Sequence, residues 1–216
     1  RQADEFNVPR ICFVNKMDRI GADFFEAMAD VKTKFGCETV AIEVPMGAGQ
    51  NFEGVIDLFE MKEIRWNAED DGETFEVTDL SDANKALAEE WREKMVDAIA
   101  SVDDDLGMLY LEGETITNEQ LKTALRNAVI ARKIVPFLCG SSRHNQGIQP
   151  LMDAITEYLP CPTDIPPAKG IQIKKHEETD VEVPCDPDAK TPIGLVFKIQ
   201  YDREAGILCF VRMYSG

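Results

Sequence analysis

The first 160 residues alternate between short apolar runs and stripes with a helical period. Residues 10–14 (RICFV) follow a proline and are too few for a helix, which favours a buried parallel strand. Residues 21–36 then repeat apolar side chains at spacings of four, three and four, at Phe24, Met28, Val31 and Phe35. These spacings predict a helix, and Gly36 is placed to end it. The order is therefore strand, loop, helix.

The middle of the chain changes from a strand pattern to a helix pattern. Residues 39–46 and 53–66 are typical of strands, with a glycine-rich turn between them. From Ser81 an apolar stripe with an i, i+4, i+8 spacing predicts an amphipathic helix of about five turns. A second helix is expected to begin at Thr117, where Gln120 completes a capping box.

A second strand, loop and helix follow. Residues 134–139 (IVPFLC) predict a buried strand, Gly140-Ser141-Ser142 a loop, and residues 148–159 a closing helix. Strands that alternate with helices in this way indicate an α/β fold with a parallel sheet.

The last third of the chain has a different character. Residues 160–192 hold seven of the eleven prolines, which predicts a domain boundary near 160 followed by a linker or irregular connection. Beyond it, two apolar runs flank a turn at residues 202–206 and predict a β-hairpin. Because two strands cannot bury a core, we expect the rest of that β domain to lie past residue 216, in a longer protein.

Composition excludes several classes of protein. The 216 residues contain no run of about 18 apolar side chains that could span a bilayer, so we expect a soluble protein that binds no membrane. The formal net charge of −17 gives no general basic field for DNA or anionic lipid, and any RNA or ribosome contact must be local. Residues 57–119 carry 20 acidic and 5 basic side chains and thus almost all of the excess, which indicates an acidic module or a solvated acidic surface.

The six cysteines predict reduced thiols in a cytosol. None of them forms a C-x-x-C pair, and only His144 and His176 could complete a zinc site, so we expect no bound metal. Cys12, Cys139 and Cys209 lie within apolar runs and are expected to be buried.

The strongest chemical signal is Asn15-Lys16-Met17-Asp18, between the first strand and its helix. In an open α/β sheet, ligands bind beyond the carboxyl ends of the strands, where this loop would lie. A carboxylate at Asp18 can accept two parallel hydrogen bonds from N1–H and the 2-amino group of guanine, an edge that adenine lacks. Asn15 can meet the ring's acceptors or brace the loop, and the stem of Lys16 can lie along the ring face.

The loop after residue 139 is a second candidate, because a backbone N–H of Gly140-Ser141-Ser142 could donate to the purine's 6-oxygen. A phosphate loop of the pattern GxxxxGK[ST] does not occur in the sequence. Residues 104–107 spell D-x-x-G, and the run 103–105 is acidic, but neither matches a phosphate sensor or a calcium loop in its context.

Several stretches resemble bacterial translation elongation factor G along the whole chain. They are VPRICFVNKMDRIGADF, GVIDLFEMKEIRWN, CGSSRHNQGIQPLMDAITEYLPCPTDIP and FKIQYD with GILCFVRMYSG. The resemblance implies a partial parallel sheet of the P-loop GTPase type with an inserted α+β subdomain, followed by the first strands of a β-barrel domain. In segments, it implies a G domain at 1–45 and 134–160, the acidic insertion at 46–133, a linker at 161–191 and the second domain at 192–216.

The resemblance also implies site residues and partners. The family's guanine-binding positions correspond to Asn15, Lys16 and Asp18, and its last nucleotide motif to Ser141, Ser142 and Arg143. Ser142 stands where alanine is usual, and Arg143 stands where an aromatic residue is common. The longer protein would be a cytoplasmic, ribosome-activated GTPase that uses GTP and GDP and moves tRNA and mRNA, and its insertion would face the stalk protein of the large subunit.

This part of such a protein lacks the phosphate loop, the switch regions and the magnesium ligands, so we expect no catalytic residues in it. We predict that the chain alone neither hydrolyses GTP nor binds it tightly. Two other interpretations stay open: a sibling ribosomal GTPase, such as a release or ribosome-protection factor, and an acidic protein-binding module that does not use its N-K-M-D sequence.

Overall fold

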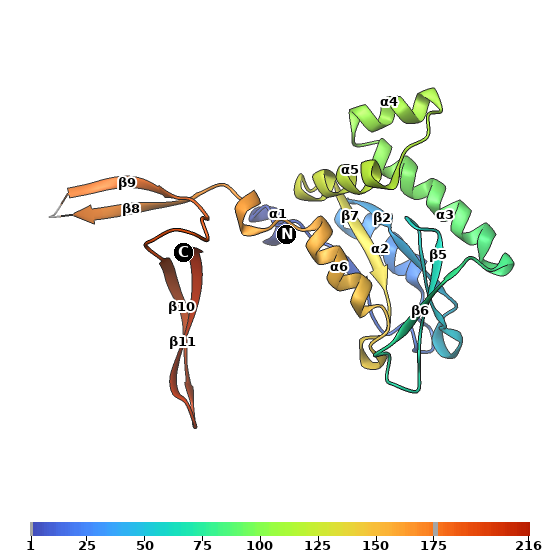
Figure 1. Cartoon of the computed structure of the whole chain (residues 1–216), viewed down its shortest axis with the longest axis horizontal. Coiled ribbons are helices and arrows are strands. Elements are labelled where there is room, and N and C mark those ends of the chain that lie inside the picture. The colour runs from blue at the N-terminus through green and yellow to red at the C-terminus, as the bar shows by residue number, and fades with distance from the viewer. Residues whose placement is uncertain (1, 175–176) are drawn as a thin grey trace. The chain divides into compact units, whose positions relative to one another are not determined.

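The computed structural model describes residues 2–174 and 177–216. The chain divides after Leu159 into two compact units, the second of which is Pro160–Gly216 (Figure 1). Each unit is described by itself below. The five-segment assignment given above stays a prediction.

A parallel sheet of three strands lies at the centre of the first unit. Its order is β1 (Cys12–Val14), β7 (Ile134–Cys139), β2 (Glu38–Ala41), and both pairings are parallel. Strand β1 leads into helix α2 (Phe24–Phe35), and β7 leads into helix α6 (Ile148–Tyr158), as the sequence predicted. Every residue of β7 is buried, because β7 is the middle strand and its apolar run meets protein on both faces.

The single strand predicted over residues 39–46 is two strands. Strand β3 (Glu43–Met46) leaves the parallel sheet and pairs antiparallel with β4 (Gly54–Asp57), the start of a four-stranded sheet. The remaining strands are β5 (Lys62–Trp66) and β6 (Phe75–Asp79), in the order β3-β4-β5-β6. The change of sheet occurs at Ile42, whose N–H bonds to β7 while its carbonyl accepts a hydrogen bond from Leu58.

Three helices follow the four-stranded sheet. They are α3 (Asp82–Ala100), α4 (Asp104–Glu112) and α5 (Asn118–Ile130). The long helix from Ser81 and the capping box of Thr117 with Gln120 are confirmed. The sequence analysis missed α4, whose first turn is the acidic run at 103–105: the Asp103 carboxylate accepts a hydrogen bond from the N–H of Leu106 and begins the helix.

Short helical segments complete the chain. They are α1 (Gln2–Glu5), η1 (Gly49–Asn51), η2 (Ser142–His144) and η3 (Pro162–Asp164). None of the helices that the structure describes combines the length and the apolar character needed to cross a bilayer.

The second unit consists of two antiparallel hairpins. Strands β10 (Ile193–Asp202) and β11 (Gly206–Ser215) form the hairpin that the sequence predicted. The irregular connection expected over residues 161–191 was wrong in part, because β8 (Ala168–Lys174) and β9 (Glu177–Val183) pair within it. The prolines of that segment lie on either side of the hairpin and none lies inside it, so its ladder keeps every backbone donor.

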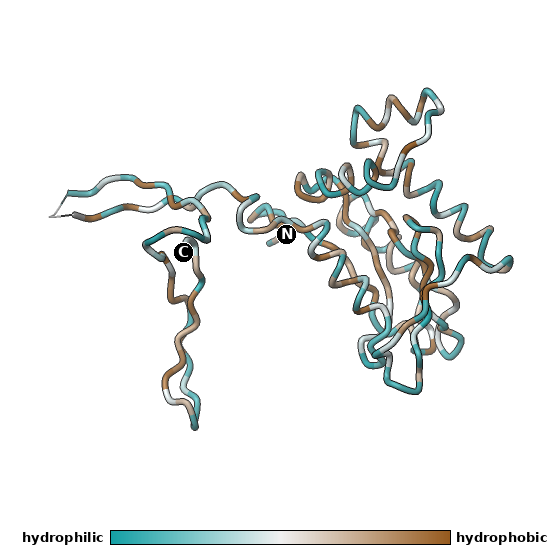
Figure 2. Tube along the Cα trace, viewed as in Figure 1, coloured by the Kyte–Doolittle hydropathy of each residue, from teal (hydrophilic) through white to brown (hydrophobic). Residues whose placement is uncertain are grey.

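All six cysteines carry free thiols. Cys139 is buried and Cys12 is partly buried, but Cys209 is exposed, which corrects the expectation that its apolar run is buried. Hairpin β10–β11 is a two-stranded sheet, and Figure 2 shows hydrophobic residues along much of its length. His176 lies outside the described residues.

Candidate functional site

The Asn15-Lys16-Met17-Asp18 loop starts where strand β1 ends. Met17 is fully buried and fixes the loop, because its N–H donates to the carbonyl of Gly140 (3.0 Å) and its carbonyl accepts from the N–H of Gly49 (2.7 Å). Lys16 reverses the chain with a left-handed backbone (φ 66°). The inward Met17 therefore leaves Asn15, Lys16 and Asp18 on the outer side of the loop.

The second candidate loop starts where strand β7 ends. Gly140 is required there, because a Cβ atom at this position would lie 2.2 Å from the carbonyl oxygen of Gln146. Ser141 is buried, and its N–H bonds back to the same carbonyl. Ser142 and Arg143 follow on the exposed short helix η2.

The fold brings the two loops into contact. Strands β1 and β7 are parallel neighbours with Val14 opposite Cys139, so their carboxyl ends meet at one edge of the sheet. The hydroxyl of Ser141 donates to Asp18 Oδ1 at 2.6 Å, and the N–H of Ser142 donates to Asn15 Oδ1 at 3.0 Å.

Asn15 braces both loops, since its Oδ1 also accepts from the N–H of Lys16 at 2.8 Å. This is the second of the two roles that the sequence left open for it. The side chains of Lys16 and Arg143 make no hydrogen bond with the described part of the chain, and both residues are exposed. The structure therefore gathers Asn15, Asp18, Ser141 and Ser142 and leaves the other two predicted residues at the rim.

The Asp18 carboxylate is hydrogen-bonded to Ser141 and partly exposed to solvent. The hydrogen bond from Ser141 is the main cause that lowers the pKa of Asp18, so the group is ionised at neutral pH. Its Oδ2 lies 3.8 Å from Arg19 Nε and 3.9 Å from His144 Nε2, beyond hydrogen-bond distance. These contacts are ion pairs, and the side chain keeps 24% of its surface exposed, so the carboxylate is partly accessible from solvent.

His144 is a site residue that sequence reasoning missed. We treated it only as a possible zinc ligand, although its position three residues after Ser141 was a sufficient signal. The bond between Asp18 and Ser141 joins residues 123 positions apart, and only the pairing of β1 with β7 makes it.

The arrangement suits a planar polar ligand. An anchored and ionised carboxylate can accept a pair of N–H donors. The described residues contain no group of three or more histidine, cysteine, aspartate or glutamate side chains placed to hold a metal. The residues present thus fit the guanine end of a nucleotide, and the sequence motif for its phosphates does not occur among the 216 residues.

The chain is similar to known proteins along its whole length. The family described as "Elongation factor Tu GTP binding domain" matches residues 1–161. "Elongation factor G 1" of Treponema denticola is 54% identical over 215 residues, which are 100% of this chain and 31% of that protein. "Elongation factor G" of Thermotoga maritima is 45% identical over 217 residues, again 100% of this chain and 31% of the relative.

A solved structure confirms the fold class. A crystal structure of a protein from Thermus thermophilus aligns with a TM-score of 0.76 and 27% identity, over 99% of this chain and 28% of that one. The chain spans about a third of the length of the curated relatives it matches. These findings confirm the resemblance to elongation factor G, and by its match over residues 1–161 the chain belongs to the family of elongation factor Tu GTP binding domains.

Proposed function

We propose that the chain is the guanine-reading part of a ribosome-dependent GTPase of the elongation factor G type. The whole protein is proposed to hydrolyse GTP in the cytoplasm while tRNA and mRNA move on the ribosome. The observation that carries the proposal is the contact of Ser141 with Asp18, which joins two loops at the carboxyl ends of adjacent parallel strands. The relatives named elongation factor G support it along the whole chain.

In the proposed site, the two carboxylate oxygens of Asp18 accept hydrogen bonds from N1–H and the 2-amino group of guanine. Ser141 holds that carboxylate ionised and oriented, so little reorganisation is needed on binding. The N–H of Ser142 already donates to Asn15, and a purine 6-oxygen would compete with Asn15 for that donor. Lys16 and Arg143, both at the rim, can cover the ring faces.

The segments take the roles that the resemblance implies. The parallel sheet and helices α2 and α6 belong to the G domain at 1–45 and 134–160, and strands β4–β6 with helices α3–α5 belong to the insertion at 46–133, whose first boundary falls within β3. Residues 57–119 of the insertion carry the acidic excess, and we propose that this surface meets the stalk protein of the large ribosomal subunit. Hairpin β10–β11 is proposed to start the second, β-barrel domain.

The chain alone is proposed to be inactive. Guanine nucleotides owe much of their affinity to contacts with phosphate groups and Mg²⁺, and the motif for those contacts is not part of these 216 residues. Isothermal titration of the chain with GDP should therefore give no sub-micromolar binding. A sub-micromolar dissociation constant would contradict this part of the proposal.

The test of base recognition uses the full-length protein that contains this chain. Asp18→Asn replaces an acceptor with a donor, so preference should move from guanine towards xanthine, whose 2-oxygen needs a donor. We expect the ratio of GDP to xanthosine diphosphate affinities to fall by at least about 100-fold, measured by competition binding.

Asp30→Asn is the matched control, because Asp30 lies on the exposed face of α2, paired with Lys34 and away from the loops. It should leave the ratio unchanged. If Asp18→Asn also leaves base preference unchanged, the chain is better explained as an acidic protein-binding module. A sibling ribosomal GTPase would pass this test and is separated by the domains beyond this chain.

A further inference from the structure

Strand β7 lacks a backbone acceptor at its last residue. The parallel ladder between β2 and β7 ends with the N–H of Ile42, which donates to the carbonyl of Phe137 at 3.1 Å. The carbonyl of Ile42 is engaged by Leu58, because the chain turns there into the four-stranded sheet. The N–H of Cys139, the next donor along β7, therefore needs an acceptor from elsewhere.

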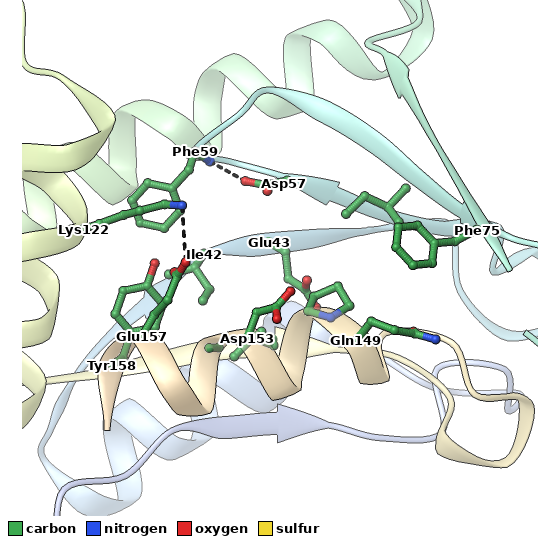
Figure 3. Close-up of a pocket in the computed structure, with 14 residues that line it drawn as sticks. Ile42, Glu43, Asp57, Phe59, Phe75, Lys122, Gln149, Asp153, Glu157 and Tyr158 are labelled. Atoms are coloured by element: carbon green, nitrogen blue, oxygen red, sulfur yellow. Dashed lines mark hydrogen bonds and ion pairs between the residues drawn. The ribbon is translucent and has the colours of Figure 1, made fainter. Parts of the chain in front are cut away.

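Glu43 supplies that acceptor. Its Oε1 accepts the N–H of Cys139 at 2.7 Å, although the two residues are 96 positions apart. Glu43 is 4% exposed, and Cys139 is fully buried, so this bond is shielded from bulk solvent. Figure 3 shows Glu43 among the side chains that line a cavity of about 180 Å³ between the four-stranded sheet and helix α6.

The residue that Glu43 fixes is next to the guanine-reading loop. Gly140 follows Cys139, its N–H donates to Val14, and its carbonyl accepts from Met17, so it ties the end of β7 to β1 and to the first loop. Ser141 comes next and holds Asp18. One short path of backbone and hydrogen bonds thus leads from a side chain on β3 to the carboxylate proposed to read the base.

We propose that Glu43 is a positioning residue for guanine recognition, through which strand β3, the strand that leads into the acidic insertion, sets the Ser141 loop against Asp18. The inference rests on the proposed function of that loop. Glu43 touches no nucleotide itself: it fixes the carboxyl end of β7. Loss of its acceptor leaves the N–H of Cys139 buried and unpaired, and the loop that starts one residue later then shifts to find a partner.

The test measures GDP and inosine diphosphate binding to the full-length protein that contains this chain. Inosine lacks the 2-amino group, so the ratio of the two affinities reports how well Asp18 is aimed. Glu43→Val should weaken GDP binding about tenfold, the cost of one lost buried hydrogen bond, and should lower the GDP preference. Glu43→Gln keeps an acceptor of the same length and should stay within about twofold of the unaltered protein in both measurements.

Glu63→Val is the matched control. Glu63 is an equally buried carboxylate of the same sheet, on β5, and it accepts hydrogen bonds from Ser81 and Asn84 at the start of α3. Its loss should destabilise the insertion without changing the ratio. If Glu43→Val leaves the ratio unchanged, or if Glu63→Val lowers it equally, Glu43 has no positioning role.

A substitute variant and two comparisons separate failure of the inference from failure of the proposed function. If Glu43→Val does not fold, Glu43→Asp replaces it, because the acceptor is then one methylene too short and the same loss of preference is expected. If the unaltered protein binds ADP as well as GDP, the proposed function fails and the inference fails with it. If Asp18→Asn changes base preference and neither Glu43→Val nor Glu43→Asp does, only the inference fails.

Discussion

Strand β7 and hairpin β10–β11 have similarly apolar sequences and opposite environments. All six residues of β7 are buried, whereas nine of the ten residues of β10 are exposed. The difference lies in what covers them: β7 has a strand on either side and helices packed on the sheet, and β10 has one partner strand. An apolar run thus predicts a strand, but its burial depends on neighbours that are distant in sequence.

The largest expected effect comes from removing one ring from each region. Phe137→Ala should lower the free energy of unfolding of the first unit by about 3–5 kcal/mol, because Phe137 is 1% exposed and packs edge-on against Phe24. Phe197→Ala should cost under about 0.5 kcal/mol, because that ring is 64% exposed. Urea unfolding of the two variants measures both values, and equal losses would contradict the comparison.

A somewhat smaller effect on stability is expected at Glu43, whose carboxyl group is buried where the chain passes from the parallel sheet into the four-stranded sheet. Burial raises the pKa of Glu43 from 4.5 to about 8, so the folded state keeps a proton that the unfolded state has lost. Stability from this group is complete below pH 4.5 and is lost as the pH rises through 8. We expect Glu43→Gln to be more stable than the unaltered chain at pH 9 by roughly 2–4 kcal/mol, and similar to it at pH 5.

Other ionisable groups line the same cavity and are common to both proteins. They are Asp57, Lys122, Asp153, Glu157 and Tyr158. Burial also raises the pKa of Asp57, which adds to the loss of stability with rising pH. The difference between the two proteins, followed by thermal unfolding from pH 5 to 9, isolates Glu43. A difference that does not grow with pH would show that Glu43 is ionised in the fold.

The smallest expected effect concerns Thr117, the N-cap of helix α5. It tests whether a capping residue adds to the stability of the well-packed first unit. Thr117→Ala removes the side chain that accepts from the N–H of Gln120 and should cost about 1 kcal/mol of unfolding free energy. Thr123→Ala, an exposed site inside the same helix, should change stability by less than about 0.5 kcal/mol. Urea midpoints compare them, and an equal loss would mean that packing alone fixes the start of α5.

These contrasts also explain which elements the sequence could predict. Strand β7 and the start of α5 depend on patterns within a few residues, the apolar run and the capping box, and both were predicted at their observed positions. Strand β6 has only two apolar residues and none that is buried, and α4 is short and begins in an acidic run, so the apolar period of each is too brief for a prediction.

The residues of the candidate site also divide into those that the sequence could predict and those that it could not. Asn15 and Asp18 could be named because their loop directly follows a strand, and Ser141 because it follows another. The bond between Cys139 and Glu43 could not be found, since it depends on the turn of the chain at Ile42 from one sheet into the other. No periodicity or motif in the sequence marks that turn.

The turn at Ile42 determines where the chain can gain or lose residues without disturbing the parallel sheet. Strands β2 and β7 are parallel neighbours, and such neighbours always need a crossover of about a dozen residues or more. Residues 42–133 are that crossover, enlarged into a sheet and three helices. This crossover starts at the carboxyl end of β2, on the sheet edge that holds Asp18, and enters β7 at the opposite edge. Its length can therefore vary widely without any change in strand order, so the outer surface can be remodelled while the edge that holds Asp18 keeps its topology.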